Sequence, residues 1–247
     1  MKKILMVLLT LATGFQLMAQ DSTENKPQKP KKDWSKVVMK NRSADHFMFQ
    51  IGIDNWAGAP DSIRIKGLSR GFNAYFMFDF PFKTDPRFSV GIGAGVSSSN
   101  IYFDKYTVDV KSSASTLPFR DVADTNHFKK YKLTTAYLEA PVELRFALKP
   151  EDMDRSWKFA IGAKVGTMVN AHTKGKTWQN SSGNTLNAYT LKETSKRFFN
   201  STRLSGTLRA GYGNLSLFGS YSITTLIKEG FGPEIRPYQI GITFSGL

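Results

Sequence analysis

The sequence predicts an all-β fold: an eight-stranded antiparallel up-and-down transmembrane β-barrel in a bacterial outer membrane. Three observations predict it. The first residues have the pattern of an export signal. From residue 45 onward, apolar residues alternate with polar or small ones in eight segments. The connections between these segments are alternately short and long, as in outer-membrane barrels.

Residues 1–19 are expected to be a cleaved signal peptide. Lys2 and Lys3 precede an apolar run over residues 4–11, and Ala19 offers a small side chain before the cut. The run is shorter than the roughly 20 residues of a spanning helix, and no later run is long enough. An exported chain of this kind is periplasmic, secreted or inserted in the outer membrane as a barrel.

Residues 20–44 are expected to form a basic, flexible periplasmic linker. They contain seven Lys or Arg residues, Pro27 and Pro30, and little apolar content. Such a composition buries too little surface to order itself. An alternative is that the basic residues contact anionic lipid or a periplasmic partner.

The barrel is predicted to cover residues 45–247. Each of its first four strands is predicted from a segment in which every second residue is apolar. These segments run over residues 47–53, 72–82, 88–96 and 138–148, with Phe, Ile, Val and Leu at every second position. The fourth segment contains Pro141, which has no N–H for the strand ladder. We therefore expect a β-bulge near Ala140-Pro141.

The last four strands follow from the same period over residues 157–165, 204–212, 215–223 and 238–244. Short turns are expected at 83–87, 149–155 and 213–214, and long loops at 57–69, 104–130, 171–196 and 225–234. The two-residue turn Gly213-Asn214 predicts that Tyr212 pairs with Leu215 and Ala210 with Leu217. Short turns facing the periplasm put the N-terminal tail there and the long loops outside the cell.

The polar face of the strands indicates that the apolar face points outward to lipid. A lipocalin-like soluble barrel alternates too, with its apolar face inside. Here the polar parity carries small residues, as at Gly91, Gly93, Gly95 and Gly162, where a solvated strand would favour Thr, Lys or Glu. Small residues make room for long side chains in a narrow lumen.

Long charged side chains occur on the same parity, four acids against five bases. A narrow barrel tolerates them only as paired groups, so we expect a structural network that fills the lumen. Glu139 should lie near Lys164 across the turn between the fourth and fifth strands. The expected network consists of Asp54, Asp79, Glu139, Glu143, Arg145, Lys158, Lys164, Arg203 and Arg209. A proton or ion path is the alternative.

The segment Tyr137-Leu138-Glu139-Ala140-Pro141 resembles the Tyr-Leu-Glu-x-Pro strand of the PorT-like outer-membrane β-barrel family of Bacteroidota-type bacteria. Residues 238–244 resemble that family's closing strand, and the resemblance covers about residues 45–247. The chain departs from the common terminal aromatic by ending Phe244-Ser245-Gly246-Leu247. The resemblance implies assembly by the barrel-insertion machinery, a link to type IX secretion components, and no catalytic residues.

No pattern in the sequence predicts an enzyme, a cofactor or a metal site. Gly91 to Gly95 lie within a strand, so they do not form a phosphate-binding loop. His127 and His172 lie in long loops and are expected at the outer rim, where a less favoured reading makes them parts of an enzyme site with Ser181, Ser182, Asp121 or Asp124.

The remaining expectations concern partners. The high positive charge does not suggest nucleic acid in an exported protein, whereas outer-membrane lipids and lipopolysaccharide offer anionic groups. Lys174, Lys176, Lys192 and Lys196 are expected to face lipopolysaccharide phosphates. Three roles remain open: a structural or accessory barrel, a surface binding or adhesion module acting through loops 104–130 and 171–196, and a rim enzyme.

Overall fold

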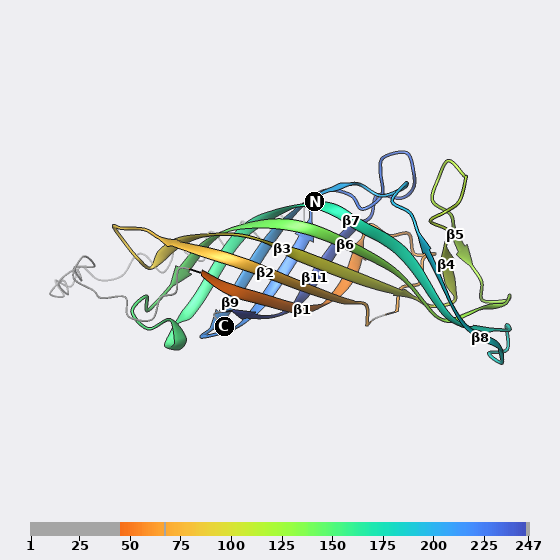
Figure 1. Cartoon of the computed structure of the whole chain (residues 1–247), viewed down its shortest axis with the longest axis horizontal. Coiled ribbons are helices and arrows are strands. Elements are labelled where there is room, and N and C mark those ends of the chain that lie inside the picture. Colours follow the sequence, from red (N-terminus) through yellow and green to blue (C-terminus); the bar gives the residue numbers. More distant parts are fainter. Residues whose placement is uncertain (1–44, 67, 246–247) are drawn as a thin grey trace, which may run out of the picture. The chain divides into compact units, whose positions relative to one another are not determined.

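The computed structural model describes residues 45–66 and 68–245, in which eight long antiparallel strands close into a barrel (Figure 1). The strands follow one another around the ring, and pairing of β1 with β11 and of β6 with β7 completes the closure. Their bounds are β1 Asp45–Ala57, β2 Arg70–Pro81, β3 Phe88–Phe103, β6 His127–Ala147, β7 Trp157–Gln179, β9 Thr202–Tyr212, β10 Leu215–Ser222 and β11 Arg236–Ser245. The predicted eight-stranded up-and-down barrel is confirmed. The predicted signal peptide, 1–19, and linker, 20–44, lie outside the described residues.

The connections alternate in length as predicted. Residues 82–87, 148–156 and 213–214 make the short turns at one end, the second of them with a 3-10 turn at Met153–Arg155. The hairpin register is confirmed, because Tyr212 pairs with Leu215 and Ala210 with Leu217. Gly213 has φ +57°, a conformation that glycine adopts without steric cost at the first position of such a turn.

The apolar face points outward, as predicted. Ile92, Leu208 and Ile240 are 44%, 61% and 62% exposed in the isolated molecule. The alternate positions of the same strands face inward and carry buried polar residues such as Ser89, Ser97 and Ser205. A lipocalin-like soluble barrel has the opposite polarity, so that alternative is wrong.

The predicted bulge at Ala140-Pro141 is wrong. On one side, Pro141 pairs with Lys164 of β7 in regular register. On the other side, β6 keeps the same register with β3 before and after Pro141, although Gly93 and Ala94 of β3 are not paired with β6. The irregularity lies on β7, where Ala136 pairs with Asn170 and Tyr137 with Met168. Val169 is therefore the extra residue, and the inward parity of β7 changes from even to odd numbers beyond it.

The long-loop end contains more regular structure than predicted. Residues 127–130 and 171–179, expected in loops, belong to β6 and β7, which extend past the other strands. Strand β8, Thr185–Thr194, pairs back on β7, and β4, Tyr106–Val108, pairs with β5, Phe119–Asp121, at the same end of the barrel (Figure 1). Among the described residues, no helix is long and apolar enough to cross a membrane.

We call the loops at this end, with the extended strands, the cap, and it has an apolar core of its own. Phe198, Phe199, Val108 and Val110 are completely buried there. They pack with further residues of the long connections, including Ile63, Leu117, Leu226, Ile227 and Ile235. The long loops therefore fold together over one mouth of the barrel.

Candidate functional site

The lumen holds two layers of charged residues, of which the upper one, nearer the cap, is centred on Glu139. The Glu139 carboxylate is ion-paired with Arg203 from β9, and its Oε2 lies 3.2 Å from Lys164 Nζ of β7. The Tyr75 hydroxyl of β2 donates to the same Oε2 at 2.5 Å. Because β2 and β9 stand on opposite sides of the eight-stranded ring, this chain of contacts crosses the whole lumen.

Asp54 of the expected network lies in the same layer without an ion pair to the described residues. It borders a small cavity of about 30 Å³ together with Lys164 and Arg203. Its Oδ2 is buried and accepts no hydrogen bond from the described part of the chain. The structure thus brings Glu139, Lys164 and Arg203 into direct contact and leaves Asp54 beside them.

The lower layer, at the short-turn end, is centred on Glu143. Its Oε2 accepts hydrogen bonds from Arg145 Nε at 2.9 Å and from Arg209 Nη2 at 2.8 Å. Arg145 Nη1 reaches Asp79 Oδ1 at 3.5 Å, and Arg209 Nη1 donates to Ser245 Oγ at 3.3 Å. These contacts run from β2 through β6 and β9 to β11, so this layer also crosses the lumen.

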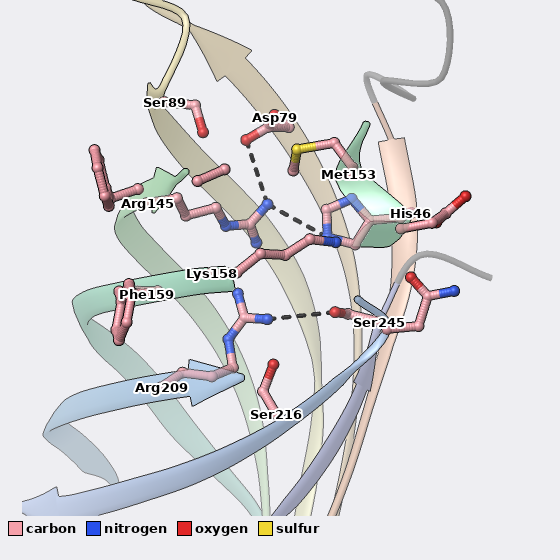
Figure 2. Close-up of a pocket in the computed structure, with 15 residues that line it drawn as sticks. His46, Asp79, Ser89, Arg145, Met153, Lys158, Phe159, Arg209, Ser216 and Ser245 are labelled. Carbon is pink, nitrogen blue, oxygen red and sulfur yellow. Dashed lines mark hydrogen bonds and ion pairs between the residues drawn. The ribbon is translucent and has the colours of Figure 1, made fainter. Parts of the chain in front are cut away.

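A cavity of about 110 Å³ opens beside the lower layer (Figure 2). Its wall includes Arg145, Lys158, Arg209 and Ser216, which come from β6, β7, β9 and β10. Figure 2 shows the two guanidinium groups directed into the space between them, which the Lys158 side chain enters from β7. Lys158 forms no ion pair with the described residues, so the ninth member of the expected network stands in the cavity wall.

The larger uncharged residues of the lumen were not predicted from the sequence, in contrast to its glycines. Met48, Tyr75 and Met77 form a buried apolar cluster, and Asn73 Nδ2 donates to Gln50 Oε1 at 3.0 Å and to Gln239 Oε1 at 2.8 Å. All lie on the inward parity of their strands. Reading every residue of that parity, and not only the charged ones, would have found them.

The small residues of β3 make room for long side chains of the neighbouring strands. A Cβ at Gly91 would lie 2.5 Å from Arg145 Cζ, and one at Gly93 would lie 2.3 Å from Met77 Sδ. Real Cβ atoms do not approach other atoms so closely. Glycine at these positions of β3 therefore allows the side chains of Arg145 and Met77 to lie where they do.

The two rim histidines do not meet. His127 pairs with Gln179 and His172 pairs with Thr134, so about seven residues of strand, roughly 23 Å, separate them. His127 is buried with the cap, whereas His172 lies on the outward parity. They are therefore too far apart to share the rim site of the less favoured reading. Within residues 45–66 and 68–245, no cluster of three or more His, Asp or Glu side chains is suited to a metal ion.

The extended strands carry a basic face, which we define as Lys130, Lys132, Lys174, Lys176 and Lys192. Lys174 pairs with Lys132 on β6 and with Lys192 on β8, and Lys130 pairs with Lys176. Three of the four lysines predicted for lipopolysaccharide contact thus lie here, with two that the sequence analysis missed. Lys196 lies apart, with its Nζ 3.5 Å from the carbonyl oxygen of Met168.

A family model described as outer membrane protein beta-barrel domain matches residues 19–242. Solved structures with a similar fold include Ail, the attachment invasion locus protein of Yersinia pestis, at 12% identity, covering 82% of this chain and 97% of that chain with a TM-score of 0.34. Neisserial surface protein A (NspA) is 11% identical and covers 82% of this chain and 96% of that chain, also with a TM-score of 0.34. No curated protein matches the chain.

The family match spans most of the chain and agrees with the closed barrel and its outward apolar face. The chain therefore belongs to the outer membrane protein beta-barrel domain family and is an outer-membrane β-barrel protein.

Proposed function

We propose that the protein is a non-conducting barrel with a structural or accessory, non-enzymatic role in the cell envelope. The observation that carries this proposal is the pair of charged layers, each of which joins opposite sides of the lumen. An eight-stranded barrel is just wide enough for side chains to fill it. Paired charges across such a lumen leave no continuous path for ions.

Ion conductance in planar bilayers tests this proposal. The wild-type protein should give no single-channel steps, and a variant with Glu139, Glu143, Arg203 and Arg209 all replaced by Ala should conduct. Gel mobility before and after heating would show that both proteins are folded. Conductance steps of the wild-type protein would contradict the proposal.

The accessory role that we propose is in type IX protein secretion. The resemblance of residues 137–141 and 238–244 to PorT-like barrels supports this role. Deleting the gene should abolish export of type IX cargo, and the full chain should restore it. Co-purification of secretion components after mild detergent extraction would support the same role, whereas unchanged cargo export would contradict it.

We further propose that the long-loop end faces the cell exterior and the short turns the periplasm. Long loops on the outer side are typical of bacterial barrels inserted by the barrel-insertion machinery. The chain has no cysteine, so single substitutions can be labelled cleanly. Ser181→Cys should react with a membrane-impermeant maleimide on intact cells, and Thr84→Cys should react only after lysis. The reverse labelling would contradict this orientation.

Lipopolysaccharide is the partner that we propose for the basic face. Like charges paired directly across strands repel one another, so anionic groups beside them are favourable. The face lies on the outward side of β6, β7 and β8, past the exposed apolar residues Val165 and Val169 of β7. Replacing Lys132, Lys174 and Lys192 by Gln should weaken binding of lipopolysaccharide to the purified barrel, with Lys83→Gln as the control.

A second candidate function is surface binding or adhesion through the cap. The folded apolar core of the loops and the projecting β7–β8 hairpin favour it, because closing a barrel requires neither. Replacing 104–126 or 180–201 with short linkers should abolish a surface phenotype while the barrel stays heat-modifiable. An unchanged phenotype would favour the accessory role alone.

A further inference from the structure

We infer that the cavity at the short-turn mouth is a binding site for a small oxyanion of the phosphate class. Four strands supply donors to its wall: Arg145 from β6, Lys158 from β7, Arg209 from β9 and Ser216 from β10 (Figure 2). His46, Asp79 and Asp154 also line it. Its volume of about 110 Å³ is far above the roughly 10–15 Å³ that one water molecule requires. In the orientation proposed above, this mouth of the barrel faces the periplasm. Nothing else about the site depends on that orientation.

Buried hydrogen-bond donors without partners point to a ligand. Arg145 Nη2, Arg209 Nε and Ser216 Oγ are all buried, and none of them bonds to another described group. The Arg209 side chain is only 8% exposed and Ser216 only 2%. Buried polar groups are nearly always hydrogen-bonded in folded proteins, so these three atoms call for an acceptor that enters the cavity.

The cationic donors at the cavity wall indicate the sign of that acceptor. The upper layer has two acids, Asp54 and Glu139, and two bases, Lys164 and Arg203. The lower layer has two acids, Asp79 and Glu143, against three bases, and Asp154 from the short turn also lines the cavity without a direct ion pair to Lys158. Both arginines of the lower layer share Glu143, and Lys158 has no ion pair with the described residues. Lys158 therefore stands at the cavity wall without a direct ion pair to the described residues, and an anion in the cavity supplies one whereas water does not.

The arrangement of the free donors favours a tetrahedral anion. Arg145 already uses Nε for Glu143 and Nη1 for Asp79 and His46 Nε2, and Arg209 uses Nη2 for Glu143 and Nη1 for Ser245. The nitrogens without any partner, Nη2 of Arg145 and Nε of Arg209, thus belong to different guanidinium groups and do not form one two-nitrogen fork for a planar carboxylate. Single donors from different strands instead surround one small space, as the oxygens of a phosphate group require.

Titration calorimetry with inorganic phosphate on the full chain, folded in detergent at low ionic strength, tests the inference. Wild-type protein should bind one phosphate per chain. Lys158→Gln removes a charge that has no direct ion pair and leaves the ion pairs of the lower layer intact, so phosphate should bind at least about tenfold more weakly. Lys83→Gln, at an exposed position in the turn between β2 and β3, should bind as wild type does.

Ser216→Ala is a second variant that changes no charge, and it should also weaken phosphate binding. Gel mobility before and after heating would show that each variant is folded. Absence of saturable binding to the folded wild type, or equal affinity of wild type, Lys158→Gln and Ser216→Ala, would overturn the inference. Displacement of phosphate by glycerol 3-phosphate would indicate a phosphate monoester as the source, and lack of displacement the free anion.

The experiments distinguish failure of the phosphate site from failure of the proposed non-conducting role. A folded barrel that binds no phosphate but gives no conductance overturns only the site. A barrel that conducts ions and binds phosphate with the expected loss in Lys158→Gln contradicts only the non-conducting role.

Discussion

At the scale of single residues, Glu139 is the centre of the upper layer of the lumen. It contacts Tyr75, Lys164 and Arg203 from three other strands, and its side chain is nearly inaccessible. A buried charge is tolerated because its partners are charged and bonded in turn. Removing this one carboxylate leaves two cations in the lumen without their anion.

Glu139→Gln is therefore expected to lower the free energy of unfolding by about 3–5 kcal/mol, the usual cost of breaking a buried ion pair. Urea unfolding of the refolded barrel in lipid vesicles would measure it. Glu234→Gln is the matched control, because its pair with Arg236 is exposed and should contribute less than about 1 kcal/mol. Equal stability of the two variants would contradict the structural role of the upper layer.

Gly91→Ala tests the close approach of Arg145. Its new Cβ would lie 2.5 Å from Arg145 Cζ, so the guanidinium must move away from Glu143 and Asp79. We expect a loss of about 1–3 kcal/mol, as for overpacked cores. Gly219→Ala is the control, because a Cβ there meets nothing within 4 Å. A Gly91→Ala variant as stable as Gly219→Ala would show that Arg145 is free to shift.

At the scale of elements, the bulge in β7 decides how the barrel joins the cap. Because Val169 is an extra residue, Ala171 and Thr173 point inward beyond it, whereas Lys164 and Met168 do so before it. The change of parity places Ala171 in the apolar core of the cap and the basic face outside. A one-residue shift in a strand sends every later side chain to the other face.

Deleting Val169 should therefore disrupt the cap while the barrel below it stays closed. Limited trypsin digestion should cut the cap of the variant faster than that of the wild type, with heat-modifiable gel mobility retained. Deletion of Ser115, exposed in the loop between β4 and β5, is the control and should leave the cap resistant. Wild-type resistance in the Val169 deletion would contradict this role of the bulge.

At the scale of the whole molecule, an outward apolar face meets the hydrocarbon of a membrane, and a polar lumen is closed off from it. Leu208 lies in the middle of the apolar band, and Leu186 lies on β8. They are 61% and 54% exposed in the isolated chain, so exposure alone does not separate them. In a membrane the two residues differ, because Leu208 is expected to face hydrocarbon and Leu186 to lie beyond it.

Leu208→Arg should destabilise the inserted barrel by about 2–4 kcal/mol, the usual cost of Arg at the bilayer midplane. Leu186→Arg, beyond the band, should change stability by less than about 1 kcal/mol. Unfolding in lipid vesicles measures both variants. If the two costs were equal, Leu208 would not face lipid.

The sequence by itself determined the eight barrel strands, their faces, the alternation of connections and the hairpin register at Gly213-Asn214. These follow from one physical cause, since each residue within the membrane faces either lipid or a narrow lumen, and the chain must alternate accordingly. The inward positions of this alternation also identified the charged residues of the lumen, including the pair Glu139 and Lys164.

Only the tertiary structure decided the bulge at Val169, the extension of β6 and β7, strand β8, the core of the cap and the cavity beside Lys158. Outside the membrane, no lipid enforces the period of two. Thr-rich and Lys-rich strands there, such as residues 171–179, look like loops in the sequence. Which lumen charges pair, and which one stands open to a cavity, depends on side chains from strands that are distant in the chain but meet across the barrel.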